Sequence, residues 1–333
     1  MLRSSSLGLV GLVGVVVGAL ASSACSNTTC DDPMPGAVYC ERGAEDAEPD
    51  FYRLTATDGV VFFTNGQDVR RVLDPSQYEV ITSRRTEPWF TSGPAGKVCW
   101  SWVSTVECAD ARSGGLSTWL AAKGESASTL RLPGTTSFIA SYSDGARSRF
   151  VIVSEGGVEQ RALGEVASAG GGGRVFGDAL YVPTFGSKPQ IVRLPLDGSG
   201  PTSVTPRGEC SLVESDGALH CISSTQSFRV APTVGDSTPL AKQGFVRQLG
   251  DTLARVEGDR VVAVDALGEE LRVLWQRPAG YEGEYVRDVA SDGHDLFIAL
   301  GRSPCSYSGK DKQSVKTCDG STGRLDIVRA PLR

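Results

Sequence analysis

Histidine is nearly absent from this 333-residue chain, which contains two, and methionine is equally scarce. The nine cysteines form no C-x-x-C element, and His220 and His294 have no ligand-spaced neighbours. Structural zinc sites are built from such spaced sets of cysteine and histidine. We therefore expect no zinc site, and we expect both histidines to have structural or surface roles.

Clusters of positive charge are also missing. The formal net charge is -6, and Arg70–Arg71 and Arg84–Arg85 are isolated pairs. Binding to a phosphate backbone needs clustered lysine and arginine. No nucleic-acid partner is expected.

Familiar catalytic motifs are absent as well. The run Ala169–Arg174 (AGGGGR) satisfies neither G-x-G-x-x-G nor G-x-x-x-x-G-K-[ST], and no strand-to-helix context follows it. There is no G-x-S-x-G nucleophile elbow. The glycine run therefore predicts a flexible turn and not a phosphate loop.

The only long apolar run lies near the N-terminus. Arg3 precedes the 14-residue run Leu7–Leu20, and the small residues Ala21–Ala24 follow it. Fourteen residues at 1.5 Å each cannot cross about 30 Å of hydrocarbon, so residues 1–24 are expected to be a removed signal peptide. No later run is long enough for a membrane helix, and the mature chain is expected to have no transmembrane span.

The end of this segment, Leu20–Cys25, resembles the lipobox of bacterial lipoproteins, with Ser22 where leucine or valine is usual. The resemblance implies a lipid on Cys25, and Ser26 is compatible with delivery to the outer membrane. We expect an exported, outer-membrane-anchored lipoprotein whose residues 25–50 form a lipidated tether and linker. Cleavage by an ordinary signal peptidase is the alternative, and it would give a soluble secreted protein.

Cysteine pairing agrees with export. Without Cys25 the chain has eight cysteines, which fall into sequential neighbours: Cys30 with Cys40, Cys99 with Cys108, Cys210 with Cys221, and Cys305 with Cys318. Disulfides across adjacent strands need Cα atoms about 4.4–6.8 Å apart, which local pairing can supply. We expect four local disulfides, as in proteins of oxidising compartments.

A short strand, a tight turn and a second strand recur along the chain. The turns are Asp58–Gly59, Ala95–Gly96, Asp144–Gly145, Gly177–Asp178, Asp216–Gly217, Gly250–Asp251 and Asp292–Gly293. Their mean spacing of 39 residues is near the roughly 40–45 of a four-stranded propeller blade. Glycine, of which there are 40, and aspartate suit turns that need positive φ. With no helix-period stretch in view, residues 51–333 predict an all-β propeller of seven blades, with six as the alternative.

One tetrad gives this pattern a family resemblance. Phe62–Asn65 (FFTN) stands where Tyr-Trp-Thr-Asp stands in YWTD β-propellers, and Tyr181–Thr184 and Phe297–Leu300 fill the same slot more loosely. The chain thus resembles a bacterial lipoprotein with a degenerate YWTD-like β-propeller domain.

The chain ends predict how the ring closes. The last recognisable strand is the third of its sheet, so the outer strand of that sheet must come from the N-terminal side. Ala37–Cys40 or Phe51–Leu54 could supply it. Pairing the first strand with the last removes two exposed sheet edges.

Ligands of propellers usually bind at the central channel, where the inner strands converge. We expect these strands at Arg53–Thr55, Ser137–Ser141, Val246–Gln248 and Val286–Ala290. Arg247, Arg287 and Asp288 are unusual in such strands and are candidate channel-lining residues. Salt bridges between blades, or exposure to solvent, are the alternatives for these three side chains.

The remaining candidates are aromatic and basic. The five tryptophans are expected to pack between blades, although Trp100 and Trp102 share one face of a strand and would form a contact site if that face is outward. The loop Cys305–Cys318 carries three lysines, and it is either a contact loop or a solvated, disulfide-held loop.

These observations favour an exported, lipid-anchored propeller that acts as a binding or interaction module at the bacterial cell envelope. Its partner would be an envelope protein or glycan, and it needs no cofactor. The first alternative is a propeller hydrolase or lactonase with a divalent metal, such as Ca²⁺, in the channel. The second is a surface adhesive or carbohydrate-binding protein that uses an exposed Trp100 and Trp102.

Overall fold

The computed structural model describes residues 30, 32–42, 53–65, 68–83, 88–102, 104–121, 126–167, 169, 173–205, 210–242, 244, 246–281, 283–302, 305–308, 315–318 and 324–332. The predicted signal peptide 1–24 and the predicted lipidation site Cys25 lie outside the described residues. The described part consists of strands and turns and contains no helix. It accordingly has no helix long and apolar enough to cross a membrane.

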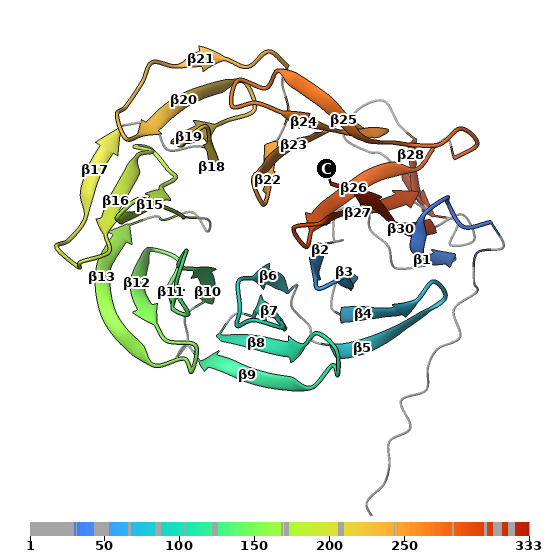
Figure 1. The fold of residues 1–333 in the computed structure, drawn as a ribbon, viewed down its shortest axis with the longest axis horizontal. Coiled ribbons are helices and arrows are strands. Elements are labelled where there is room, and N and C mark those ends of the chain that lie inside the picture. The colour runs from blue at the N-terminus through green and yellow to red at the C-terminus, as the bar shows by residue number, and fades with distance from the viewer. Residues whose placement is uncertain are drawn as a thin grey trace, which may run out of the picture.

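Seven four-stranded antiparallel sheets surround a common axis, each running from an inner to an outer strand (Figure 1). Blade 1 contains β2 (Leu54–Thr57), β3 (Val60–Asn65), β4 (Asp68–Asp74) and β5 (Gln77–Ser83). Blade 2 contains β6 (Trp89–Thr91), β7 (Lys97–Ser101), β8 (Thr105–Asp110) and β9 (Leu116–Ala121). Blade 3 contains β10 (Ser126–Arg131), β11 (Phe138–Ser143), β12 (Arg147–Val153) and β13 (Glu159–Ala167).

Blade 4 contains β14 (Arg174–Phe176), β15 (Ala179–Pro183), β16 (Ile191–Pro195) and β17 (Thr202–Thr205). Blade 5 contains β18 (Ser211–Ser215), β19 (Ala218–Ile222), β20 (Gln226–Ala231) and β21 (Thr238–Pro239). Blade 6 contains β22 (Val246–Leu249), β23 (Thr252–Val256), β24 (Arg260–Val264) and β25 (Glu270–Gln276). Blade 7 contains β26 (Tyr285–Ser291), β27 (Asp295–Arg302), β30 (Arg324–Pro331) and β1 (Ala37–Arg42). The predicted seven-bladed propeller is confirmed, and the alternative of six blades is wrong.

Six of the seven predicted turns join the first two strands of a blade. The exception is in blade 3, where Asp144–Gly145 joins β11 to β12 and residues 133–136 make the first turn. The inner strand of blade 3 is therefore β10 and not the predicted Ser137–Ser141. Since β10 (SASTLR) has a single large apolar residue, the hydrophobic pattern does not mark it as a strand.

The core is divided among the seven interfaces between neighbouring blades. Each interface in the described part holds one cluster of buried apolar side chains. Strand alternation supplies both faces of a blade: on β3, Phe62 packs toward blade 2 and Phe63 packs toward blade 7. The two phenylalanines of the FFTN tetrad thus pack on opposite faces of blade 1.

The N-terminal strand β1 closes the ring. It pairs antiparallel with β30, with Ala37 opposite Val328 and Cys40 opposite Asp326. Of the two segments that the sequence offered, Ala37–Cys40 is therefore the correct one. Because β1 lies within residues 25–50, the propeller takes in part of the segment predicted to be a linker.

Buried polar contacts hold the closing segment in place. Asp326 is fully buried, accepts a hydrogen bond from the Met34 amide at 3.2 Å, and pairs with Arg324. Arg324 also donates to the Asp32 carbonyl at 2.8 Å. These bonds tie the residues just before β1 to the third strand of blade 7.

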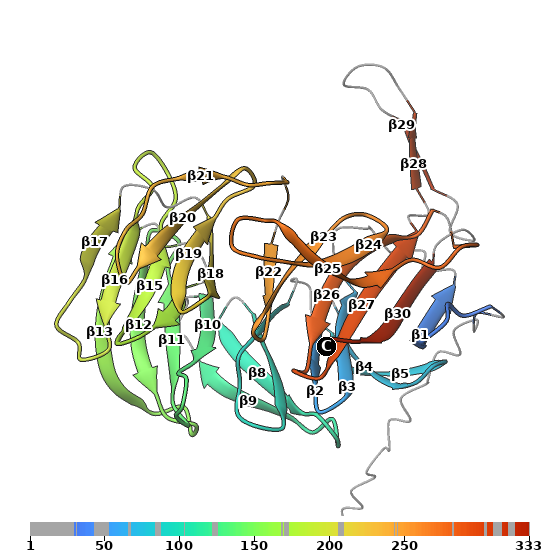
Figure 2. The ribbon, with the colours of Figure 1, turned by 45° about the horizontal axis from the view of Figure 1, so that its top comes forward.

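Three of the four predicted disulfides are present: Cys30–Cys40, Cys99–Cys108 and Cys210–Cys221, with Cα separations of 5.8, 4.0 and 5.4 Å. In the fourth predicted pair, Cys305 lies opposite Cys318 where β28 (Cys305–Ser308) pairs with β29 (Val315–Cys318). The side chains of that pair lie outside the described part of the structure. The β28–β29 hairpin stands out from the ring (Figure 2).

Tyr39 tests the closure. Its side chain is 1% exposed and packs against the rings of Phe63 at 5.3 Å and Tyr78 at 5.9 Å, both in blade 1. We expect Tyr39→Ala to lower the free energy of unfolding by about 3–5 kcal/mol, because it leaves a cavity at the last interface of the ring. Urea denaturation measures the change. Tyr285→Ala, at a residue that is 52% exposed, should stay within about 0.5 kcal/mol of the parent. A Tyr39→Ala protein as stable as this control would contradict the role given to β1.

Candidate functional site

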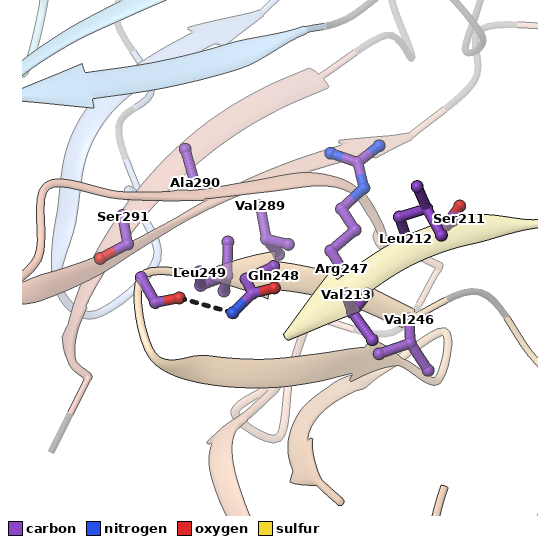
Figure 3. Close-up of a pocket in the computed structure, with 11 residues that line it drawn as sticks. Ser211, Leu212, Val213, Val246, Arg247, Gln248, Leu249, Val289, Ala290 and Ser291 are labelled. Atoms are coloured by element: carbon purple, nitrogen blue, oxygen red, sulfur yellow. Dashed lines mark hydrogen bonds between the residues drawn. The ribbon is translucent and has the colours of Figure 1, made fainter. Parts of the chain in front are cut away.

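Two cavities lie along the inner strands. The smaller, of about 400 Å³, is lined by β18, β22 and β26 together with residue Gly250 (Figure 3). The larger, of about 770 Å³, is lined by β6 and by strands of blades 1 to 4. Both cavities are lined by residues of inner strands, which makes these strands the candidate functional surface.

Arg247 and Asp288 form an ion pair beside the smaller cavity. Arg247 lies on β22 and Asp288 lies on β26, so the pair links the inner strands of blades 6 and 7. Asp288 is 3% exposed, whereas the Arg247 side chain is 44% exposed. The carboxylate is therefore buried in the wall, and the guanidinium extends away from the β22 backbone (Figure 3).

Backbone amides hold the Asp288 carboxylate in position. The amide of Leu54, at the start of β2, donates to Oδ2 at 2.8 Å, and the amide of Val289 donates to Oδ1 at 3.0 Å. A buried carboxylate needs such donors to offset its lost hydration. Asp288 therefore joins the inner strands of blades 7 and 1 and also holds the Arg247 guanidinium by its ion pair.

Arg53 and Trp89 continue the polar wall into blades 1 and 2. The Arg53 guanidinium lies over the Trp89 ring, 4.3 Å from its centroid, in a cation–π contact. Burial lowers the pKa of Arg247, and the nearby positive charge of Arg53 lowers it further. Two guanidinium groups thus influence the same region of the channel wall.

The third candidate, Arg287, is placed differently. The pairing of β26 with β27 shifts between Val286 and Asp288, so Arg287 is the extra residue of a β-bulge. Its stem lies against Gly301 of β27, where an added Cβ would come within 3.2 Å of the arginine Cγ. The structure therefore brings Arg247 and Asp288 together and leaves Arg287 outside their ion pair.

Gln248 makes the smaller cavity a structural joint as well. Its side-chain amide donates to the carbonyls of Glu214 and Gly250 at 3.1 and 3.0 Å, and its Oε1 accepts from the Glu214 amide. The bond to the Gly250 carbonyl is the dashed line in Figure 3. These bonds tie the inner strands of blades 5 and 6. Both donors of the Gln248 side-chain amide are thus engaged in contacts within the protein.

Trp89 does not follow the expectation that all tryptophans pack between blades. It is 53% exposed on the inner strand β6, and it lines the larger cavity. Trp100 and Trp102 behave in the opposite way, since they are 0% and 4% exposed in the cluster between blades 1 and 2. The adhesive hypothesis therefore loses the exposed pair on which it rested.

The remaining sequence candidates lie in different parts of the ring. His220 lies on β19, where burial lowers its pKa and the charge of Arg229 adds to that effect. In the described ranges, no three His, Cys, Asp or Glu side chains come close enough together to hold a metal ion. Ala169, the first residue of the AGGGGR run, bridges to Thr184, and residues 170–172 of the run lie outside the described residues.

Comparison with known proteins found no matching family and no matching curated protein. Among solved structures, the AfRom2 CNH domain has a TM-score of 0.53 at 8% identity, covering 92% of this chain and 98% of that one. A streptogramin B lyase has a TM-score of 0.50 at 13% identity, covering 87% and 98%. A chain of the nidogen/laminin complex has a TM-score of 0.47 at 15% identity, covering 66% and 93%. At these identities the likeness shows the β-propeller fold alone, and the YWTD-like character stays a prediction.

A double-mutant cycle on Arg247→Ala and Asp288→Asn tests the ion pair of the channel wall. We expect a coupling energy of about 1–2 kcal/mol in urea denaturation, because the Asp288 carboxylate is buried. The matched control is the exposed pair Arg193–Asp178, whose aspartate side chain is 81% exposed. That cycle should give less than about 0.5 kcal/mol. Equal coupling in the two cycles would show that Asp288 does not hold Arg247.

Proposed function

We propose that this protein is an exported, lipid-anchored β-propeller that acts as a binding module at the bacterial cell envelope, through the groups that face its axis. One observation carries the proposal: two inner-strand side chains, Arg247 and Trp89, are each held by a charged residue and are still 44% and 53% exposed. Arg247 is held by Asp288, and Trp89 is held by Arg53. Such preorganised groups bind at a low cost in side-chain entropy.

The chemistry of these groups is that of recognition. A fixed guanidinium offers several N–H donors in one plane, and an exposed indole offers a flat apolar face. Neither group readily supplies the acid, base or nucleophile that a hydrolase needs near neutral pH. An envelope protein or a glycan is the partner that we propose, and no cofactor takes part.

The disulfides support a place at the envelope. Three disulfides within local hairpins and loops fit an oxidising compartment. Cys30 is linked to Cys40 of β1, so a lipid on Cys25 would lie five residues from a covalent link to the ring. Five extended residues span at most about 18 Å, which would keep the propeller close to the membrane surface.

The binding role can be tested by photo-crosslinking in living cells. A photoreactive amino acid replaces Tyr285 or Ser211, which are exposed on the inner strands β26 and β18. The control position is Ser83, exposed on the outer strand β5. We expect discrete adducts from both inner positions and none from position 83, read by gel shift and mass spectrometry. No adducts at the inner positions, or equal adducts at position 83, would sink the proposal.

The anchor is tested separately. If Cys25 carries the lipid, Cys25→Ser should move the protein from the membrane fraction to the soluble fraction of a cell lysate, because one acylated cysteine is the proposed tether. The conservative variant Ser26→Ala, beside it, should remain in the membrane fraction. Continued membrane association of Cys25→Ser would count against lipidation and leave the channel test unaffected.

A further inference from the structure

The larger cavity has an unusual lining for a space between blades. It extends from β6 at the axis into the interface between blades 3 and 4, and its volume is about 770 Å³. Ten of its nineteen lining residues in the described part carry a hydroxyl group, and none is charged. We name this cavity the serine cleft.

Five serines gather on the face of blade 3 that looks toward blade 4. They are Ser126 and Ser128 of β10, Ser141 and Ser143 of β11, and Ser148 of β12. The register makes them one patch, because directly opposed residues share a face of the sheet: Ser126 lies opposite Ser143, which also lies opposite Ser148. The adjoining row pairs Ser128 with Ser141.

The same face becomes apolar away from this patch. Leu130, Ile139 and Ile152 follow the serines in register and pack with the buried side chains of blade 4. The serines thus replace apolar packing at one end of the interface. Of the five serines only Ser148 is buried, Ser126 is exposed and the other three are partly exposed, so this end of the interface is open to solvent.

One pair of hydroxyl groups keeps hydrogen-bonding capacity, whereas Ser126 donates to the Ser143 carbonyl and Ser143 Oγ accepts from the Gly145 amide. Ser128 Oγ and Ser141 Oγ lie 2.7 Å apart and share one hydrogen bond. Each hydroxyl has one donor and two acceptor sites, so a bonded pair retains one proton and unused lone pairs. The lining can therefore both donate to and accept from a hydroxylated ligand.

Trp89 adds an apolar platform at the axial side of the cleft. Its ring rests against the Arg53 guanidinium at 4.3 Å, and the residue is still 53% exposed. Phe90 and Phe150 are further aromatic residues of the lining. A flat, held aromatic face beside a wall of hydroxyl groups is a two-part recognition surface.

We infer that the serine cleft binds a neutral carbohydrate, with sugar hydroxyls on the serines and an apolar sugar face on Trp89. A charged ligand would lose its hydration without meeting an opposite charge among the lining residues, and the nearby Arg53 guanidinium already lies over the Trp89 ring. A purely apolar ligand would separate the partly exposed serine hydroxyls from water without replacing the hydrogen bonds that water supplies. The volume holds roughly two or three sugar rings. This inference rests on the proposed binding function and names its ligand class.

The test uses the purified chain with maltotriose and chitotriose as neutral probes. Isothermal titration calorimetry should give saturable binding to at least one probe. Trp89→Ala should weaken that binding at least tenfold, and the double variant Ser128→Ala/Ser141→Ala should weaken it several-fold. Phe185→Ala, at an aromatic residue that is 48% exposed outside the cleft, and Ser83→Ala should leave it unchanged. Circular dichroism of each variant confirms the fold, and the milder Trp89→Phe replaces Trp89→Ala if that variant fails to fold.

Two outcomes would overturn the inference. One is the absence of saturable binding to either probe up to about 10 mM, and the other is binding that Trp89→Ala does not alter. Adducts from the inner strands in cells without sugar binding would reject the carbohydrate ligand and keep the binding module. Sugar binding without such adducts would support the serine cleft and reject an envelope partner at the axis.

Discussion

A blade of this ring has two apolar faces, and it is stable only while a neighbour covers each of them. Seven buried clusters in the described part, one at each interface, meet this requirement. The constraint acts most strongly at the closure, where β1 pairs with a strand about 290 residues away. Blades form from local hairpins, but the final interface requires a long loop to close. That cost rises only slowly with loop length, by about 0.6 kcal/mol per doubling, so a single well-packed strand can offset it.

Charge at the closure adds specificity to this packing. Asp326 and Glu284 are 0% and 1% exposed, and burial raises the pKa of Glu284. Such groups are costly unless donors surround them, and here Arg324 lies between the two carboxylates. Arg324 donates to the Asp32 carbonyl, and Asp326 accepts from the Met34 amide. Both hydrogen bonds form only when the segment just before β1 is docked on blade 7. The network therefore favours the pairing of this one segment with β30 in one register. Apolar packing alone would define that register less sharply.

How much of this could be read from the sequence depends on whether a signal is local. Turns that contain glycine are local, because positive φ is a property of the turn itself, and the seven predicted turns, four of them Asp-Gly, located six of the seven blades correctly. In blade 3 the predicted inner strand is in fact the second strand of the sheet, because the Asp144–Gly145 turn follows β11 and the true inner strand is rich in serine. The Arg247–Asp288 pair joins two blades, so the sequence marked its members without showing that they meet. Trp89 was missed because the three residues of β6 cannot show which face lies at the axis.

The geometry of the ring explains why these exceptions gather at its centre. Inner strands converge, and large apolar side chains from neighbouring blades have less room to interdigitate there than at the middle strands. Serine and arginine at the axis therefore cost little packing, and these positions can change for binding while the apolar rows stay fixed. A ligand in the serine cleft would contact blades 2, 3 and 4 at once. Because it would bind only the assembled ring, it would stabilise the fold in proportion to its concentration relative to Kd. Binding at the axis and burial between the blades would then favour the same closed state.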